Sequence, residues 1–415
     1  MDEIDGERAS GATADASAKG PRKAAVAFIF VTITLDMLAV GCIIPVLPKL
    51  VESFLSGNTV TASMYMGLFG TVWSVMQFLS MPVMGSLSDH HGRRPVVLLS
   101  NLGLGLDYVL MALAPSLWWL FIGRAISGIT GASISTATAY IADVTPEEKR
   151  AGAFGLLGAA FGLGFILGPA VGGLAGSINP RLPFWIAAGM SLANFCYGYF
   201  VLPESLPRDR RSPFKWRNAN PVGALRFLSA IPGLLPLAFI QFLSYLAHEV
   251  LPAVTVLYMG YRYGLAEASV GFFLACVGIG SAIIQSVVVR KAVARFGESK
   301  VLIVGLLCGA LGFVVYGIAP NATAFWLGIP LVALWGMAGP SVQGLMSRKV
   351  SSKEQGQLQG AVSSLRGVSG IIGPGLFSGT FALFIGSWHA FGAPGAPFIL
   401  SGLLLAAGGA LAIAL

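Results

Sequence analysis

PESLPRDRRSPFKWRNANP, residues 203–221, is a polar stretch rich in arginine and proline inside an otherwise apolar chain. It belongs to the longest connection between apolar segments, and six such segments precede it and six follow it. The stretch therefore predicts a linker between two helical bundles. The expected bounds are 24–203 for the first bundle, 204–231 for the linker and 232–415 for the second bundle.

The composition predicts that most of the protein surface faces lipid. Hydrophobic residues make up 55% of the 415 residues, charged residues make up 11%, and the mean hydropathy is +0.77. A soluble domain carries about 25% charged residues, and a membrane-spanning helix needs about 20 apolar residues. The sequence thus predicts an all-α membrane protein with twelve transmembrane helices. The expected spans are 24–48, 63–85, 95–114, 117–141, 152–176, 184–203, 232–259, 268–290, 300–319, 324–346, 357–381 and 397–415.

The first 23 residues differ from the rest of the chain. They carry five acidic residues among Gly, Ala and Ser and show no apolar periodicity, so we expect a disordered segment. The apolar run that follows is too long for the short core of a signal peptide. We therefore expect it to form the first span.

The distribution of basic residues predicts the orientation. All but five of the 26 Lys and Arg residues fall in segments on the same side as the N-terminus. Lys49, Arg181 and Arg262 fall on the other side, and Arg124 and Arg366 lie within spans. Because cytoplasmic loops carry an excess of Lys and Arg, both termini are expected in the cytoplasm. The net charge of +8 follows from this topology, so we expect a lipid bilayer and no nucleic-acid partner.

Several landmarks repeat at an offset of 205 residues. Gly92 corresponds to Gly297 and Gly123 to Gly328, and the pairs Ala114-Pro115 and Gly168-Pro169 recur at 319–320 and 373–374. Parallel repeats with a substrate site between them are a known plan of secondary transporters. The offset predicts two six-helix pseudo-repeat bundles.

Charged residues inside apolar spans are the first candidates for function, because each costs about 2.5–3.5 kcal/mol at the membrane centre. Asp36 and Asp107 lie near the middle of spans 1 and 3, and Arg124 lies in span 4 among small residues. We expect one of the two aspartates to pair with Arg124. These groups either bind protons on a transport path or form a static pair that fixes helix packing.

Span 7 carries a polar stripe along one helical face. His248 beside Glu249 is a candidate proton-binding pair, because histidine titrates near neutral pH. The alternative is that Glu249 is a solvated residue at the outer mouth. For Arg366 in span 11, a transport role and a structural role are both open. Polar candidates for the substrate path are Gln241, Tyr245, Ser281, Gln285 and Gln343.

The segment GSLSDHHGRRPVV, residues 85–97, resembles the cytoplasmic signature G-x-L-x-D-x-x-G-R-R of the major facilitator superfamily. Its second glycine permits a tight turn, and its two arginines suit carboxylates or lipid headgroups. The resemblance implies that this cluster holds the two halves together when the cavity opens outward. His90 departs from the pattern, which has a basic Arg or Lys there. The implied gate residues are Gly85, Asp89, Gly92, Arg93, Arg94 and Asp143.

Two further segments resemble signatures of the same family. Residues 123–128 are similar to the fourth-span motif, whose buried arginine is implicated in proton transfer. GAAFGLGFILGPAVGG, residues 158–173, is similar to a fifth-span motif that drug/proton antiporters have and symporters lack. Its glycines allow close helix approach and its proline bends the helix, which implies a hinge and a proton seal, whereas generic glycine packing is the alternative. The antiporter-motif residues are Gly164, Gly168, Pro169 and Gly172.

The first half resembles tetracycline/proton antiporters over nearly its whole length, most clearly in LDMLAVGCIIPVLP (35–48), LDYVLMALA (106–114) and residues 123–145. In the second half, Ser281 and Gly309 stand where those pumps carry histidine and aspartate, while Gln285 is retained. His248 and Glu249 are the hypothetical replacement for the missing titrating groups. The resemblance implies roles in coupled export for Asp36, Arg93, Asp107, Arg124 and Asp143.

The energy source is expected to be a proton gradient. The chain contains no Gly-Lys pair and hence no phosphate-binding loop of the Walker type. We expect no cofactor and no metal site, and proton-coupled efflux of a small amphipathic compound, with a tetracycline-like drug as the leading candidate. Export of another drug or an endogenous metabolite, and uptake by proton symport, are the alternatives. An enzyme would need clustered nucleophiles, bases or metal ligands, which the sequence does not offer. The resemblance implies a monomer in a bacterial inner membrane.

Overall fold

The computed structural model describes residues 20–131, 133–146, 150–212, 221–351 and 354–415. Residues 1–19 of the predicted disordered segment lie outside the described part, while residues 20–23 begin the first helix. The described residues contain twelve helical spans long and apolar enough to cross a membrane. This confirms the predicted all-α membrane fold with twelve spans.

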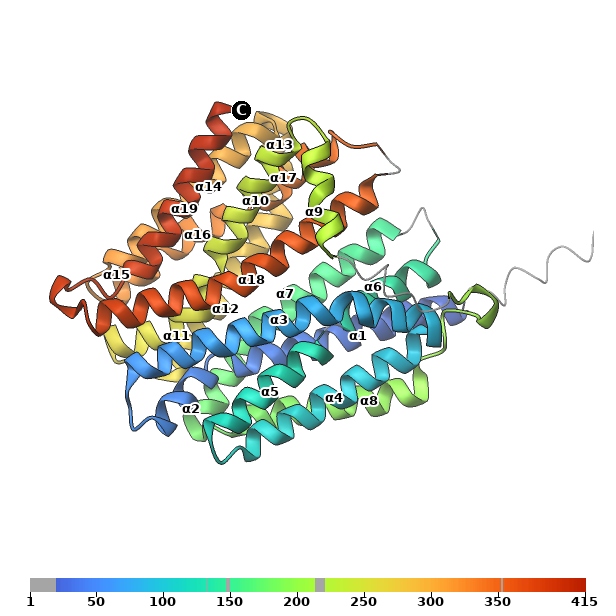
Figure 1. The fold of residues 1–415 in the computed structure, drawn as a ribbon, viewed down its shortest axis with the longest axis horizontal. Helices are drawn as coiled ribbons and strands as arrows, with labels where there is room; N and C mark the ends of the chain where they lie inside the picture. The colour runs from blue at the N-terminus through green and yellow to red at the C-terminus, as the bar shows by residue number, and fades with distance from the viewer. Residues whose placement is uncertain (1–19, 132, 147–149, 213–220, 352–353) are drawn as a thin grey trace, which may run out of the picture.

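The first six spans form the lower bundle in Figure 1. Their helices are α1 (Gly20–Ile43), α2 (Leu47–Phe54), α3 (Thr59–His91), α4 (Arg93–Leu113), α5 (Leu117–Thr130), α6 (Ser133–Val144), α7 (Arg150–Ile178) and α8 (Leu182–Val201).

The last six spans form the upper bundle. Along the chain, the connection between the two bundles contains the short helix η2 (Arg208–Arg210) and α9 (Pro221–Ala230). The upper bundle consists of α10 (Leu234–His248), α11 (Val250–Tyr263), α12 (Glu267–Ile283), the π-helix η4 (Ile284–Val288), α13 (Val289–Phe296), α14 (Glu298–Ile318), α15 (Ala322–Trp326), α16 (Ile329–Trp335), α17 (Ala338–Ser347), α18 (Gln355–Ile385), η5 (His389–Phe391) and α19 (Ala396–Ala414).

The helix bounds repeat at the same offset as the sequence landmarks. Helix α4 covers 93–113 and α14 covers 298–318, a shift of 205 at both ends. Each is preceded by a glycine with positive φ, at 105° for Gly92 and 79° for Gly297, a conformation that glycine adopts without steric cost. The two helices end in nearly the same backbone conformation, at Ala114 and Ala319.

Spans 1, 4, 7 and 10 are each broken into shorter helices, and the local sequence explains most of the breaks. Pro45 separates α1 from α2, Gly131 ends α5, and Pro330 follows the break between α15 and α16. Glu249 separates α10 from α11, three residues before Pro252, which has no N–H for a helical hydrogen bond. Discontinuous spans leave backbone and polar side chains free to line a site.

The two bundles meet along two seams, α3 against α18 and α7 against α12. On the first seam, Ser63 Oγ donates a hydrogen bond of 2.8 Å to the carbonyl of Ser378, and Thr71 Oγ1 donates one of 3.1 Å to that of Ile371. Figure 1 shows α3 and α18 running side by side. We call the end of the molecule with the α3–α4 turn the motif end, at the right of Figure 1, and the other the opposite end.

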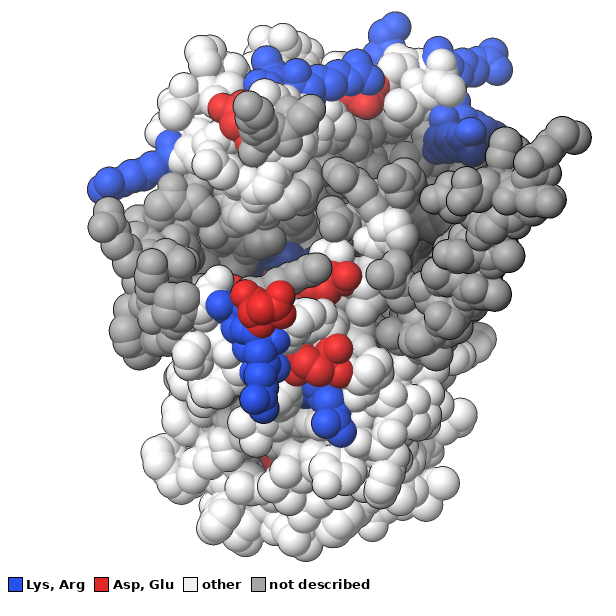
Figure 2. Space-filling model, turned by 90° about the vertical axis from the view of Figure 1, so that its right-hand side faces the viewer, with Lys and Arg blue, Asp and Glu red and all other residues white. Residues whose placement is uncertain are grey.

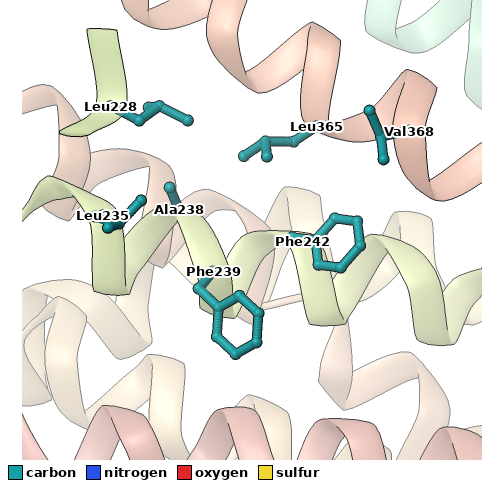
Figure 3. Close-up of a pocket in the computed structure, with 7 residues that line it drawn as sticks. All are labelled: Leu228, Leu235, Ala238, Phe239, Phe242, Leu365 and Val368. Carbon is teal, nitrogen blue, oxygen red and sulfur yellow. The ribbon is translucent and has the colours of Figure 1, made fainter. Parts of the chain in front are cut away.

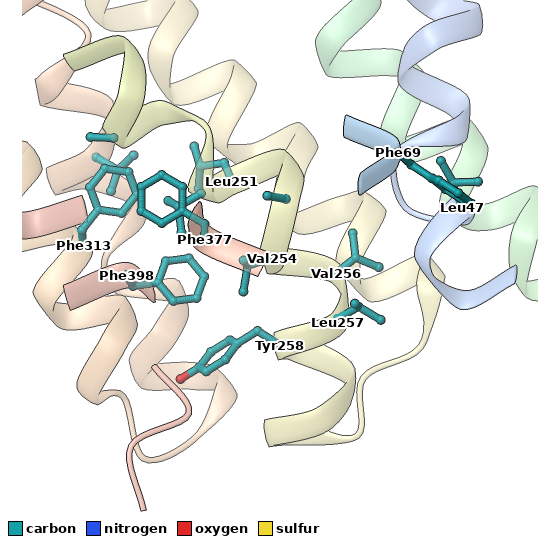
Figure 4. Close-up of a cluster of buried hydrophobic side chains, with 14 of the residues drawn as sticks. Leu47, Phe69, Leu251, Val254, Val256, Leu257, Tyr258, Phe313, Phe377 and Phe398 are labelled. Atoms are coloured by element: carbon teal, nitrogen blue, oxygen red, sulfur yellow. The ribbon is translucent and has the colours of Figure 1, made fainter. Parts of the chain in front are cut away.

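One hydrophobic core crosses between the bundles near the opposite end. Leu47 and Phe69 from the first bundle belong to the same buried cluster as Val256 and Leu257 from the second (Figure 4). Within the second bundle this cluster is aromatic, and Tyr258 at its centre donates a 3.3 Å hydrogen bond to the carbonyl of Tyr316. The opposite end is therefore the closed end of the molecule.

Toward the motif end the seams separate. Among the glycine positions, the contact nearest the motif end is that of Gly367 with Phe78 on α18 and α3, and that of Gly278 with Ile166 on α12 and α7. Closer to the motif end, a methyl group added at Gly158 or Gly162 of α7 would meet no atom within 4 Å. The space between the bundles thus opens at the motif end.

Candidate transport site

The signature between α3 and α4 folds into a polar network around Arg93. Its Nε donates a 3.1 Å hydrogen bond to Oδ2 of Asp143, and its Nη1 donates one of 2.7 Å to Ser88 Oγ. Nη1 also lies 2.5 Å from Oδ1 of Asp89, and the backbone N–H of Arg93 donates to Glu204 Oε1 at 2.8 Å. The side chain of Arg93 is only 10% exposed, so the carboxylates of Asp89 and Asp143 hold a nearly buried guanidinium, while that of Glu204 holds the backbone of the same residue.

All these partners belong to the first bundle or to the start of the linker. Arg94 donates a 2.7 Å hydrogen bond to the carbonyl of Tyr199 at the end of α8. His90, which departs from the family pattern, lies with its Nδ1 3.4 Å from the carbonyl of Ser212. Within the described residues the network makes no ion pair with the second bundle. Figure 2 shows a group of acidic and basic side chains near the middle of the motif end, apart from the basic side chains at the top of the view.

The second bundle repeats the central ion pair with its charges exchanged. At the offset of 205, Arg93 corresponds to Glu298 and Asp143 to Arg348, and Arg348 Nη2 lies 2.9 Å from Glu298 Oε1. The Arg348 side chain is 72% exposed, against 10% for Arg93. Sequence reasoning missed this pair, although the offset applied to the signature would have found it.

The two pairs are expected to differ in their contribution to stability. Asp143→Asn should lower the free energy of unfolding by about 2 kcal/mol, because it removes a charged hydrogen-bond partner of a nearly buried arginine. Arg348→Gln should cost less than about 1 kcal/mol, as for exposed ion pairs in general. Unfolding midpoints of the purified variants in detergent would measure both. Equal losses of unfolding free energy in the two variants would contradict the larger contribution assigned to the Arg93–Asp143 pair.

Asp36 lies in the membrane interior and is held by a residue that sequence reasoning missed. Its side chain is 5% exposed, and Asn194 Nδ2 on α8 donates to its Oδ1 at 3.2 Å and to the carbonyl of Thr32 at 3.2 Å. Asn194 falls in an apolar segment of span 6, so its polarity was the available signal. The single amide leaves most of the hydrogen-bonding capacity of the carboxylate unused.

Asp107 and Arg124 lie near each other without forming the predicted ion pair. Asp107 is 2% exposed, and neither carboxylate oxygen has a hydrogen-bond partner. Arg124 Nε is also unpaired, and its guanidinium lies over the ring of Trp73 at 5.4 Å. A Cβ at Gly123 would lie 2.9 Å from Asp107 Oδ1. Of the two aspartates predicted as partners of Arg124, Asp107 is therefore the one that lies near enough to interact with it electrostatically, whereas Asn194 holds Asp36.

The polar stripe of span 7 meets Arg366 at the break between α10 and α11. Glu249 is the sixteenth residue of the 30-residue span Leu234–Tyr263, so it lies mid-span and not at the outer mouth. The guanidinium of Arg366 lies over the ring of Tyr245 at 5.9 Å. The ring of His248 lies 5.9 Å from that of Trp335 on α16, whose Nε1 donates to Ser244 Oγ at 3.1 Å. His248 is exposed at mid-span, as expected for a side chain beside an open space.

The remaining substrate-path candidates divide into two groups. Gln241 is buried with an unpaired Oε1, and Gln343 on α17 has a buried unpaired Nε2. Ser281 is half-buried on α12, and Gln285 is exposed within η4. π-Helical segments inside α-helices occur often at functional sites. The structure does not bring these four residues into direct contact by any hydrogen bond among the described residues.

The glycines of the fifth-span motif allow α7 to pack directly on α1. A Cβ at Gly168 would lie 2.6 Å from Cα of Gly41, and one at Gly172 would lie 2.0 Å from the carbonyl oxygen of Cys42. The same helix continues the contact into the second bundle, where a Cβ at Gly271 would lie 2.2 Å from the carbonyl oxygen of Pro169. The motif therefore joins span 1 to the α7–α12 seam.

An apolar recess of about 250 Å³ lies between α9, α10 and α18 on the outer side of the second bundle (Figure 3). It is lined by Leu228, Leu235, Ala238, Phe239, Phe242, Leu365 and Val368. Phe239 and Leu235 are half exposed, so this recess faces the lipid side. The charged residues described above lie on the other side of α18.

Comparisons with known proteins agree with this architecture. The sequence matches the family profile "Major Facilitator Superfamily" over residues 29–374 and 237–415. It is 38% identical over 368 residues to the class C tetracycline resistance protein of Escherichia coli, covering 88% of this chain and 91% of that protein. It is 37% identical over 363 residues to the class D protein of Salmonella ordonez, covering 87% and 90%.

Among solved structures, a bacterial homologue of the human lysosomal transporter Spinster, in an inward-facing and unoccupied conformation, has a similar fold. The TM-score is 0.72 at 18% identity, and the alignment covers 95% of this chain and 97% of that chain. The twelve spans and the profile match together show that this chain belongs to the major facilitator superfamily and is a multi-pass membrane transporter, not an enzyme.

Proposed function

We propose that this protein is a proton-coupled exporter of a small amphipathic compound, with tetracycline as the leading candidate. The observation that carries the proposal is the pair of acids in the membrane interior, Asp36 and Asp107, whose carboxylates have one hydrogen-bond partner between them. Ionisable groups at this depth mark ion or proton paths in transporters. The substrate candidate comes from the relatives, which are tetracycline resistance proteins.

The arrangement supports a simple transport cycle. The space between the bundles is open at the motif end, and the excess of Lys and Arg there indicates the cytoplasmic side. Substrate would enter from the cytoplasm, and the motif end would then close while the opposite end opens. Asp89 is half exposed in its ion pair with Arg93, and in that step its carboxylate would also meet the second bundle. Protonation of Asp107 would change its attraction to Arg124 and so bias the two states.

The second bundle supplies its own titratable groups in this proposal. Ser281 and Gly309 replace the usual histidine and aspartate, whereas His248 and Glu249 lie at mid-span beside the opening. We propose that they take over proton binding in this half. The protein would act as a monomer in a bacterial inner membrane and draw its energy from the proton gradient.

Export of a compound other than tetracycline is the second candidate. The observation that favours it is that the second bundle departs from the tetracycline pumps at the two positions above. Uptake by symport is disfavoured by the antiporter motif, whose glycines make the close α1–α7 contact.

Transport by everted membrane vesicles tests the proposal. Vesicles carrying the protein should accumulate radiolabelled tetracycline when respiration acidifies their interior, and a protonophore should abolish the accumulation. Vesicles without the protein, and vesicles with Asp209→Asn on the exposed helix η2, are the controls. Accumulation that survives the protonophore would overturn proton coupling. Absence of tetracycline transport with gradient-driven movement of another drug would favour the second candidate.

A further inference from the structure

Each bundle holds one arginine over an aromatic ring beside the opening between the bundles. Arg124 lies over Trp73 in the first bundle and Arg366 over Tyr245 in the second. The two arginine–ring pairs lie at the same depth along the α3–α18 seam. Ser74, the neighbour of Trp73 on α3, contacts Gly370 on α18, and Gly370 is about one helical turn from Arg366. A guanidinium stacked on a ring keeps its N–H groups free at the edge.

Arg366 points toward the opening and not toward lipid. Leu365 and Val368 line the outer recess, and Arg366 lies about 200° around the helix from Val368 at 3.6 residues per turn. Its neighbours on α18 contact α10 through Ser369 and α3 through Gly367. The side chain therefore emerges between α10 and α3, where it is exposed although it is the twelfth residue of a 31-residue helix.

The guanidinium of Arg366 has no hydrogen bond or ion pair with any described residue. It lies over the face of Tyr245 and interacts electrostatically with His248 and Glu249. Glu249 is the nearby acid, but it packs against Gly373, where an added Cβ would lie 2.3 Å from Glu249 Cβ. An unpaired charge inside a membrane protein is costly. Five N–H donors in a planar fork match a delocalised oxyanion better than any neutral group.

We propose that Arg366 is a substrate-binding residue that selects compounds carrying a delocalised oxyanion, such as a carboxylate, a sulfonate or an ionised enol. Tyr245, His248 and Trp335 supply the aromatic surface for the apolar body of the same compound, and Glu249 competes with the substrate for the arginine. This inference rests on the proposed export function, because it names the substrate class of the same cavity. Of the transport and structural roles that the sequence leaves open for Arg366, the proposal chooses the transport role.

A matched pair of probes tests the charge requirement directly. 8-Anilinonaphthalene-1-sulfonate and N-phenyl-1-naphthylamine share one aromatic skeleton and differ by the sulfonate. Equilibrium dialysis against the purified full-length protein in detergent measures binding of each probe without a proton gradient. The sulfonate should bind at least tenfold more tightly than the neutral amine, after subtraction of binding to detergent alone. Equal affinities would overturn the proposal.

Variants separate a binding role from a structural one. Arg366→Gln should weaken sulfonate binding about tenfold and leave the amine unchanged, whereas Arg366→Lys should retain an intermediate affinity because the charge remains. Glu249→Gln should strengthen sulfonate binding, since it removes the competing anion. Arg290→Gln, an exposed arginine at the end of span 8, is the matched control and should change neither probe. Weaker binding of both probes in Arg366→Gln would indicate a packing role and contradict selection of anions.

The binding measurements also keep the two proposals apart. Selective sulfonate binding without gradient-driven transport would uphold the anion site and reject proton-coupled export. Gradient-driven tetracycline export with equal binding of the two probes would uphold proton-coupled export and reject the anion site. Competition of the sulfonate with tetracycline transport, lost in Arg366→Gln, would support both.

Discussion

Asp107→Asn is expected to reduce proton-driven tetracycline accumulation in everted vesicles to the level of vesicles without the protein. Asparagine has nearly the same shape as aspartate but cannot exchange a proton. Both oxygens of Asp107 lack partners in the described structure, so the substitution breaks no hydrogen bond. The same change at Asp36 should act similarly, since an asparagine oxygen can still accept the bond from Asn194.

Two further measurements on Asp107→Asn distinguish a loss of proton coupling from a loss of folded protein. Asp107→Asn protein should purify in the same amount as the unaltered protein and unfold at a similar temperature, because a buried unpaired charge has been replaced by a neutral group. Tetracycline-induced release of protons, followed with a pH-sensitive dye, should be absent. Persistence of normal accumulation in Asp107→Asn would contradict a role in coupling, and a large fall in protein yield would assign the residue to packing.

The fold could be predicted from sequence because each of its determinants is local or periodic. Apolar length specifies each span, Pro45 and Pro252 break spans 1 and 7, and Gly92 and Gly297 occupy turns that require positive φ. The offset of 205 residues links the two bundles without any knowledge of contacts.

The site could be predicted only in part. Charge inside an apolar span identified Asp36, Asp107 and Arg124 as buried polar residues, but not their partners. Asn194 and Trp73 come from other helices, and which helices meet depends on packing across the bundle. For the same reason the direction of Arg366 was open until α18 was placed between α10 and α3. The partner of a buried charge depends on how the helices pack in three dimensions, whereas the cost of inserting that charge into the membrane can be estimated from its own span.

Gly172→Ala is expected to destabilise the first bundle by about 3 kcal/mol, the upper part of the usual range for overpacking. The added Cβ would lie 2.0 Å from the carbonyl oxygen of Cys42 and 2.6 Å from its Cα. These are backbone atoms of α1, so no side-chain rotation can relieve the clash and the two helices must move apart. Thermal unfolding of the detergent-purified protein, together with its yield in membranes, measures the effect.

Gly162→Ala on the same helix is the matched control. Nothing lies within 4 Å of a Cβ at that position, and alanine is favoured over glycine in a helix by about 1 kcal/mol. Gly162→Ala should therefore unfold at the same or a higher temperature. If the two variants behaved alike, direct α1–α7 contact would not be what these glycines provide. If only Gly172→Ala fails, the glycines of the antiporter motif act through close packing, and that packing holds Asp36 on α1 at a constant position relative to the α7–α12 seam.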